Sequence, residues 1–129
     1  MTRKRPKQRA AAGVLGKAIT RRSRGRCELC ESRDEPRLYE LAPFPDEPDL
    51  DRTLLLCVRC RSWLEDEPVD PVRAHFLSSA VWSDLPPVKL AAARMLLACD
   101  FQDDHWVADA LEASNVDPAS GEFRVDAVD

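Results

Sequence analysis

Two pairs of cysteines are the residues whose type and spacing point most directly to chemistry. Each pair has the pattern Cys-x2-Cys, and 26 residues separate the pairs, whose members are Cys27, Cys30, Cys57 and Cys60. The x2 spacing lets both thiolates of a pair face one ion, and two pairs complete a tetrahedral zinc site. Because four thiolates leave no position for water, we predict a structural Zn2+ ion and not a catalytic one. A redox function for the second pair would leave the first pair unexplained.

The compartment expected from the sequence supports metal binding by these cysteines. The N-terminus is basic but lacks the apolar stretch of a secretory signal, and no run of about 18 apolar residues predicts a membrane span. We therefore expect a cytoplasmic protein with no membrane partner. In a reducing compartment, paired cysteines bind metal more often than they form structural disulfides.

Positive charge is concentrated before the first cysteine pair. The chain of 129 residues has a net charge of -4, yet residues 1–26 hold ten of its 19 Lys and Arg and none of its 23 Asp and Glu. Such an arm can contact several phosphates of a nucleic acid, can bind an acidic protein surface of its own or another chain, or can stay solvated. The candidate nucleic-acid-binding residues are Arg3, Lys4, Arg5, Lys7, Arg9, Lys17, Arg21, Arg22 and Arg24.

Four arginines flank the cysteine pairs. Zinc with four thiolates carries a local charge of about -2, which neighbouring cations can offset. The residues in position to do so are Arg26, Arg33, Arg59 and Arg61.

Hydrophobic periodicity predicts the elements that position the cysteines. Apolar residues at helical spacing over residues 10–22 predict an amphipathic helix that ends at Ser23-Arg24-Gly25. A short strand is expected at 37–42, a Pro/Asp-rich loop at 43–52 and a buried strand at 53–56. A helix over 58–65 follows the second cysteine pair.

The remaining chain is predicted to be helical. Asp70 with Pro71 at the first helical position predicts a helix through Val81. Asp84 is expected to cap a second helix, and Asp103 or Asp104 a third. Trp63, Trp82, Trp106 and Cys99 are expected to pack as core residues.

We predict an α+β fold with five parts. They are a disordered basic tail (1–9), a basic helix (10–26), a zinc-binding module (27–66), a helical segment (67–114) and a flexible C-terminal tail (115–129) with at most a short strand. The module is expected to be a zinc ribbon or a treble clef, and the helical segment to contain three helices.

The cysteine module resembles that of HNH nucleases, in which a strand between the pairs supplies a catalytic His. Here Tyr39 and Glu40 stand at that place, and Arg61 follows the second pair where a His is common. The only histidines, His75 and His105, fall in the predicted helical segment. Without a placed general base, we expect no enzymatic activity.

A larger part of the chain, about residues 22–113, resembles the PhnA family of zinc-ribbon proteins. In the module, the match comprises Cys27-Glu28-Leu29-Cys30, Leu38-Tyr39-Glu40-Leu41 and Leu55-Leu56-Cys57-x2-Cys60. Beyond it, the match comprises Phe76-Leu77-Ser78-Ser79-Ala80-Val81-Trp82-Ser83-Asp84-Leu85-Pro86-Pro87-Val88 and then Ala93-Arg94-Met95-Leu96. Glu31 replaces a Gly common in the family, and Ser78-Ser79 replaces an Asn-Asp pair. The resemblance implies a small cytoplasmic zinc protein, and the family's association with alkylphosphonate use defines no reaction.

The sequence thus predicts a non-enzymatic structural-zinc protein that binds a macromolecule, either nucleic acid or an acidic protein surface, through residues 1–26. Two alternatives stay open at this point. One is a catalytically degenerate HNH-like nucleic-acid binder, and the other is an uncharacterised enzyme linked to phosphonate metabolism.

Overall fold

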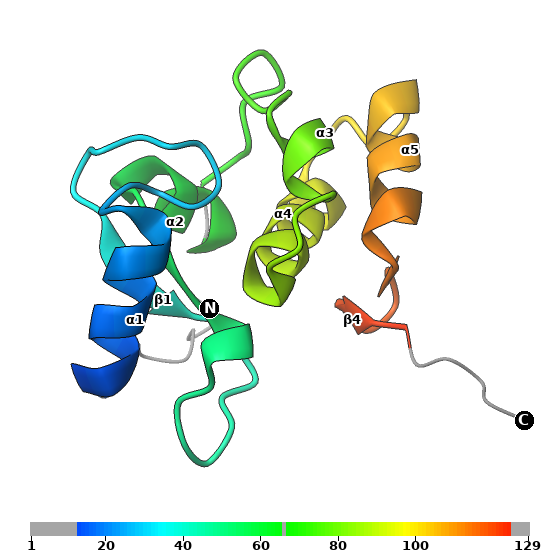
Figure 1. The fold of residues 1–129 in the computed structure, drawn as a ribbon. Helices are drawn as coiled ribbons and strands as arrows, with labels where there is room; N and C mark the ends of the chain where they lie inside the picture. The colour runs from blue at the N-terminus through cyan, green and yellow to red at the C-terminus, as the bar shows by residue number, and fades with distance from the viewer. Residues whose placement is uncertain (1–12, 66, 125–129) are drawn as a thin grey trace, which may run out of the picture. The chain divides into compact units, whose positions relative to one another are not determined.

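The fold combines helices with two small sheets, as predicted for its class. A computed structural model describes residues 13–65 and 67–124 (Figure 1). The chain divides into two compact units, Met1–Glu67 and Pro68–Asp129, called here the N-terminal and C-terminal units. The expected tail at 1–9, with Arg3, Lys4, Arg5, Lys7 and Arg9, lies outside the described residues. Within the described part of the chain, no helix has both the length and the apolar character needed to cross a membrane.

The N-terminal unit consists of a helix, a β-hairpin and a second helix. Its elements are α1 (Gly13–Ser23), β1 (Arg37–Glu40), the 3-10 helix η1 (Leu50–Arg52), β2 (Thr53–Leu56) and α2 (Val58–Glu65). The bounds of β2 and α2 agree with those predicted, whereas the first strand ends two residues earlier than expected.

Helix α1 presents an apolar side to the hairpin and a basic side to solvent. Ile19 is completely buried, and α1 packs against β2. A Cβ atom built on Gly16 would lie 3.7 Å from Leu38 Cδ1, so the helix also runs close to β1. The helix ends at Ser23 because Arg24 and Gly25 adopt positive φ angles of 59° and 74°, which turn the chain out of the helix.

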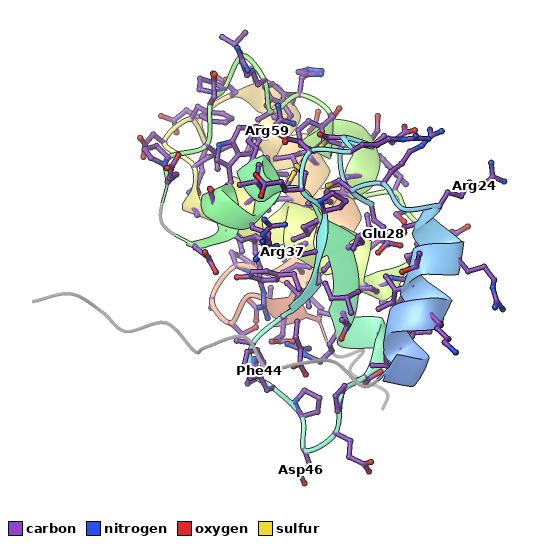
Figure 2. The ribbon with its side chains drawn as sticks, turned by 90° about the vertical axis from the view of Figure 1, so that its left-hand side faces the viewer. Arg24, Glu28, Arg37, Phe44, Asp46 and Arg59 are labelled. Carbon is purple, nitrogen blue, oxygen red and sulfur yellow. The ribbon has the colours of Figure 1, made fainter. Side chains whose placement is uncertain are left out.

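The hairpin supplies the buried centre of this unit. Strands β1 and β2 pair antiparallel, with Arg37 opposite Leu56 and Glu40 opposite Thr53. All four residues of β2 are buried. The loop between the strands contains a cis peptide bond before Pro43. Asp49 accepts a hydrogen bond from the backbone N–H of Asp51 at 2.8 Å and so begins η1. Figure 2 shows Phe44 and Asp46 on this loop.

The C-terminal unit is a group of three packed helices followed by a small hairpin. Its elements are α3 (Leu77–Ala80), α4 (Pro86–Ala98), α5 (His105–Ser114), β3 (Val116–Asp117) and β4 (Glu122–Phe123). The three helices pack on one another, as Figure 1 shows. The apolar face predicted for α4 is buried, and Cys99 at its end is 5% exposed.

The helix predicted from Asp70 to Val81 is wrong over its first half. Asp70 does bond to the backbone N–H of Val72, at 2.9 Å, but it closes only a turn. Val72 is 87% exposed, so the apolar residue expected to hold this segment on a core has nothing to pack against. Only α3 is helical, because its Leu77 and Ala80 are buried and hold this turn in place.

Two further expectations for this unit need correction, and a third is confirmed in position only. Trp82 is 71% exposed and does not pack in a core. Asp84 does not cap α4: the N-cap is Leu85, with prolines in the first turn, and Ser83 accepts the Leu85 N–H instead. Asp104 is the N-cap of α5, but its side chain makes no capping hydrogen bond.

The segment after α5 is more ordered than the tail expected there. Strands β3 and β4 pair antiparallel, and Asn115 turns the chain with a φ of 59°. Arg94 of α4 donates to the Gly121 carbonyl at 3.0 Å and to Glu122 at 2.5 Å. A side chain of α4 therefore ties the hairpin to the helices of this unit. Residues 125–129 lie outside the described part.

Candidate metal centre

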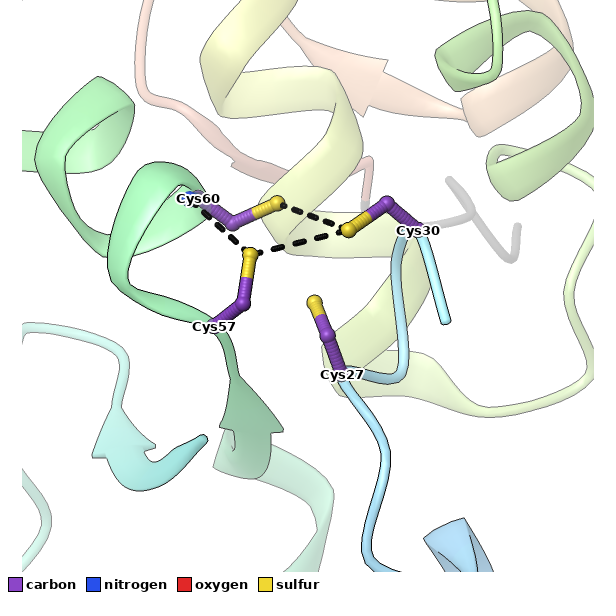
Figure 3. Close-up of side chains that lie close together, drawn as sticks. All are labelled: Cys27, Cys30, Cys57 and Cys60. Carbon is purple, nitrogen blue, oxygen red and sulfur yellow. Dashed lines mark hydrogen bonds between the residues drawn. The ribbon is translucent and has the colours of Figure 1, made fainter. Parts of the chain in front are cut away.

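The fold brings the four predicted cysteines into one cluster. Their sulfur atoms all lie within 4.8 Å of one another (Figure 3). The Cys30 Sγ atom is 3.6 Å from that of Cys57 and 3.8 Å from that of Cys60. These separations are too long for disulfides, and all the cysteines are free. Four sulfurs about 2.3 Å from a tetrahedral centre lie about 3.8 Å apart, so the cluster has the dimensions of a zinc-thiolate site.

Each pair of ligands comes from a different local structure. Cys27 and Cys30 lie on a turn after α1, closed by hydrogen bonds from the Cys27 N–H to the Ser32 carbonyl and from the Glu31 N–H to the Cys27 carbonyl. Cys57 follows β2, and Cys60 lies in the first turn of α2. Glu31 has a φ of 67°, in the left-handed region that favours glycine.

The cluster favours negative charge on one sulfur before the others. Hydrogen bonds from the Cys27 and Cys60 thiols hold the pKa of Cys30 far below its usual value. The hydrogen bond with Cys30, together with burial, raises the pKa of Cys27 to about 11. Hydrogen bonds with Cys27 and Cys30 also raise the pKa of Cys60. Two of the thiols therefore keep their protons at neutral pH until a cation replaces them.

Arg59 is the flanking arginine that faces the sulfurs most directly. Burial opposes its charge, but electrostatic interactions with the sulfurs, that of Cys30 above all, outweigh burial and raise the pKa of the guanidinium. The Cζ atom also lies 4.8 Å from the centroid of the Trp63 ring on α2. The predicted role of Arg59 in offsetting the charge of the cluster is thereby supported.

The other three flanking arginines are placed differently. Arg61 donates to the Leu56 and Glu35 carbonyls at 2.6 and 2.7 Å, and so joins the start of β1 to the end of β2. Arg26 lies 3.8 Å from the carboxylate of Glu31. Arg33 is exposed.

Glu28 is a structural residue of the centre that its sequence position does not reveal. Its carboxylate accepts two hydrogen bonds from Arg22, at 2.6 and 2.9 Å, and one from the Leu55 N–H at 2.8 Å. Its own N–H donates to the Leu55 carbonyl, and its side chain is only 4% exposed. Figure 2 shows Glu28 beside α1. Glu28 thus fastens the turn that carries Cys27 and Cys30 to α1 and β2.

The structure separates the candidate basic residues of α1 into two groups. Arg22 faces inward, since besides Glu28 it bonds the Thr53 carbonyl at 3.1 Å, and it serves the fold. Lys17, Arg21 and Arg24 are exposed, and Figure 2 shows Arg24 extending away from α1. Among residues 13–65 and 67–124, none of these three cations is part of an ion pair.

Comparison of the chain with protein-family models, with curated proteins and with solved structures finds no match. The class that the fold and the site define is therefore a mixed helix and small-sheet protein with a four-cysteine centre able to hold a metal ion.

Metal affinity is expected to fall steeply as the pH falls. Binding must displace protons from at least Cys27 and Cys60, whose raised pKa values keep them protonated at neutral pH. Displacing two protons lowers the apparent affinity by roughly 100-fold for each unit of decrease in pH. Competition titration against a chelator of known affinity at pH 7.5, 6.5 and 5.5 measures this slope. An affinity that does not change with pH would contradict thiolate ligation.

Proposed function

We propose that this chain is a non-enzymatic zinc protein of PhnA type that binds the phosphate backbone of nucleic acid through the basic face of α1 and the preceding residues. Zinc acts as a structural ion that holds the hairpin, α1 and α2 together, so that its binding free energy contributes to folding.

The arrangement of elements around the cluster supports a treble-clef module in this proposal. One pair of ligands comes from a turn, and the other from the end of β2 and the first turn of α2, with β1 and β2 paired between them. Thiolates at the N-terminus of α2 also benefit from the positive end of the helix dipole. Zinc is the ion best suited to four sulfurs at these separations.

The exposed basic face of α1 is the observation that carries the nucleic-acid proposal. Lys17 and Arg21 lie about one turn apart on α1, Arg24 directly follows the helix, and all three are exposed, as is Thr20. Gly16, Lys17, Thr20 and Arg21 line a shallow hollow on this face. Cations without carboxylate neighbours on one helix face can follow successive phosphates and release their counterions. The five Lys and Arg of residues 1–12 would extend this surface.

Glu40 stands near the place of the HNH histidine, and it is buried. Its burial supports a binding function over a catalytic one. A general base must reach the proton that it removes. Glu40 is only 4% exposed, and its backbone pairs with Thr53 in the hairpin. Nuclease chemistry at this position would require a side chain open to substrate.

Duplex DNA binding measured by fluorescence anisotropy at several salt concentrations tests the proposal. Replacing Lys17, Arg21 and Arg24 together by Gln is expected to weaken binding at least tenfold at low salt. The slope of log K against log salt should become less steep by about three, because three phosphate contacts are lost.

A matched control removes the same charge elsewhere on the surface. Arg33, Arg37 and Arg124 are exposed and lie outside the α1 face, and their replacement by Gln should leave the slope unchanged. Equal losses in both triple variants would show that net charge alone drives binding, and absence of binding by the wild-type chain at low salt would refute the proposal.

A further inference from the structure

The C-terminal unit has a groove between the end of α3 and one side of α5, two helices that pack together (Figure 1). Two hollows, of about 350 and 200 Å³, both have Trp82 and Asp109 in their walls. Trp82 follows α3 and is 71% exposed. The facing side of α5 contributes the small residues Ala110 and Ala113, which leave room beside the indole. An aromatic side chain that lines a concave surface together with polar groups is typical of a binding site.

Trp106 gives the groove a second aromatic wall. It lies on α5, about one turn before Asp109, and lines the smaller hollow. Its ring lies 4.7 Å from the His75 ring and 6.0 Å from the Phe101 ring, measured between centroids, so packing holds it in place. The groove therefore offers two indoles. An indole attracts a cation that lies over its face, and it does so more strongly than the other aromatic side chains.

Carboxylates on α5 give the groove a negative rim. Asp109 and Glu112 are three residues apart, so they lie on one face of the helix, and both are exposed. Neither forms an ion pair with another residue that the structure describes. Residues 68–124 contain four Lys and Arg, and two of them, Arg73 and Arg94, pair with carboxylates elsewhere in the unit. The rim therefore favours a cation supplied from outside the unit.

We propose that this groove binds an arginine side chain in a basic segment of a partner protein. A guanidinium can stack on an indole and donate two hydrogen bonds to a carboxylate at the same time. The larger hollow offers both contacts, because Trp82, Asp109 and Glu112 line it together. An ammonium group lacks the planar fork that uses them at once.

The extent and the charge of the groove define the class of partner. The second hollow continues past Trp82 to Trp106, so the groove extends beyond one side chain and fits a peptide segment. The carboxylates of the rim repel phosphate, which makes this surface unsuited to nucleic acid. Every residue of the groove belongs to the C-terminal unit, and the inference stands apart from the proposed function.

NMR titration of the zinc-loaded, full-length chain with the peptide acetyl-Gly-Arg-Gly-Arg-Gly-amide tests the proposal. Replacing Trp82 by Phe assigns its indole N–H signal, and its exposure should make the change tolerable. At millimolar concentration the peptide is expected to shift the Trp82 signal, while the Trp63 signal from the N-terminal unit stays unchanged. Raising the salt to about 0.5 M should weaken this binding, because exposed charge pairs are screened.

Matched peptides test the choice of arginine. A peptide with Gln in place of Arg should cause no shift of the Trp82 signal. A peptide with Lys in place of Arg has the same charge, and it should bind about threefold or more weakly because it loses the bidentate contact.

Groove variants locate the contact. The double variant Asp109→Asn with Glu112→Gln should bind the Arg peptide about tenfold more weakly, because hydrogen bonds to charged groups are lost. The control double variant, Asp100→Asn with Asp103→Asn, removes the same charge from exposed residues outside the groove and should keep the affinity of the wild-type chain. Indole signals that match those of the wild-type chain before peptide is added show that the variants are folded.

Four results would overturn the proposal. They are a Trp82 signal that the Arg peptide does not shift, equal binding of the Arg peptide and either matched peptide, equal loss of affinity in both double variants, and a peptide-free Trp82 signal that changes on dilution. The last would mean that a second copy of the chain occupies the groove. Peptide binding without DNA binding would refute the proposed function alone, and DNA binding without peptide binding would refute only this inference.

Discussion

A Cys60→Ser variant is expected to bind no zinc tightly and to lose the folded structure of the N-terminal unit. In the wild-type chain, Cys60 is completely buried in the cluster, and its Sγ atom lies 3.8 Å from that of Cys30. The three thiolates that remain in the variant cannot complete the tetrahedral shell. Structural zinc sites contribute about 10 kcal/mol or more to folding. The unit is small and its hairpin buries little other surface. The binding free energy lost with the ion should therefore exceed the free energy of unfolding of the unit.

Native mass spectrometry measures the zinc stoichiometry, and the NMR chemical shift of the Trp63 indole N–H measures whether the unit is folded. Trp63 is 6% exposed on α2 and reports on the folded unit. The matched control is Cys99→Ser, since Cys99 is buried in the C-terminal unit and donates only to the Leu96 carbonyl. The control should keep one zinc per chain. A wild-type chain that keeps its Trp63 signal after chelation under reducing conditions would refute the structural role of the ion.

Replacing Glu28 by Gln is expected to lower the free energy of unfolding by about 3 kcal/mol. The substitution keeps the shape but removes the charge that Arg22 meets in a bidentate pair, and it places an amide where three donors converge. The loss of one partner from a largely buried ion pair leaves the other charge poorly compensated. Urea denaturation of the zinc-loaded chain measures the change.

Glu31→Gln is the matched control, because it makes the same substitution on the same turn. Glu31 is 81% exposed and meets Arg26 only at 3.8 Å, so its loss should cost less than about 0.5 kcal/mol. A double variant that also replaces Arg22 by Met should recover part of the loss caused by Glu28→Gln. Equal effects of the two Glu→Gln variants would show that the contacts of Glu28 contribute no more than an exposed pair.

Local patterns predicted the elements next to the cysteines. Strand β2 has four apolar residues in a row, and α2 begins directly after Cys57, so short-range sequence decides both. The prediction was wrong for residues 70–76, where a capping Asp and an apolar period indicate a helix. There the local signal closes only a turn, because Val72 is exposed and gains no burial.

The partners of Glu28 and the exposure of Trp82 could not be inferred from sequence. Arg22 and Glu28 are six residues apart, across the end of a helix and a turn, and the Leu55 N–H comes from a strand far along the chain. No helical or strand period relates such positions. Likewise, apolar residues at helical spacing are predicted to be buried, but the contacts made in the tertiary structure determine which of them are buried.

The sequence by itself determined the chemistry of this protein: four thiols with metal-binding spacing, a basic segment before them and an acidic remainder. The tertiary structure decided which charged side chains pair within the fold and which are exposed to a ligand. It turns Arg22 inward to pair with Glu28, leaves Lys17 and Arg21 on the outer face of α1 with Arg24 exposed just after it, and places Trp82 in solvent beside two carboxylates. The physical reason is that spacing along the chain fixes which side chains share a local face. Whether that face meets protein or water depends on contacts made between distant segments.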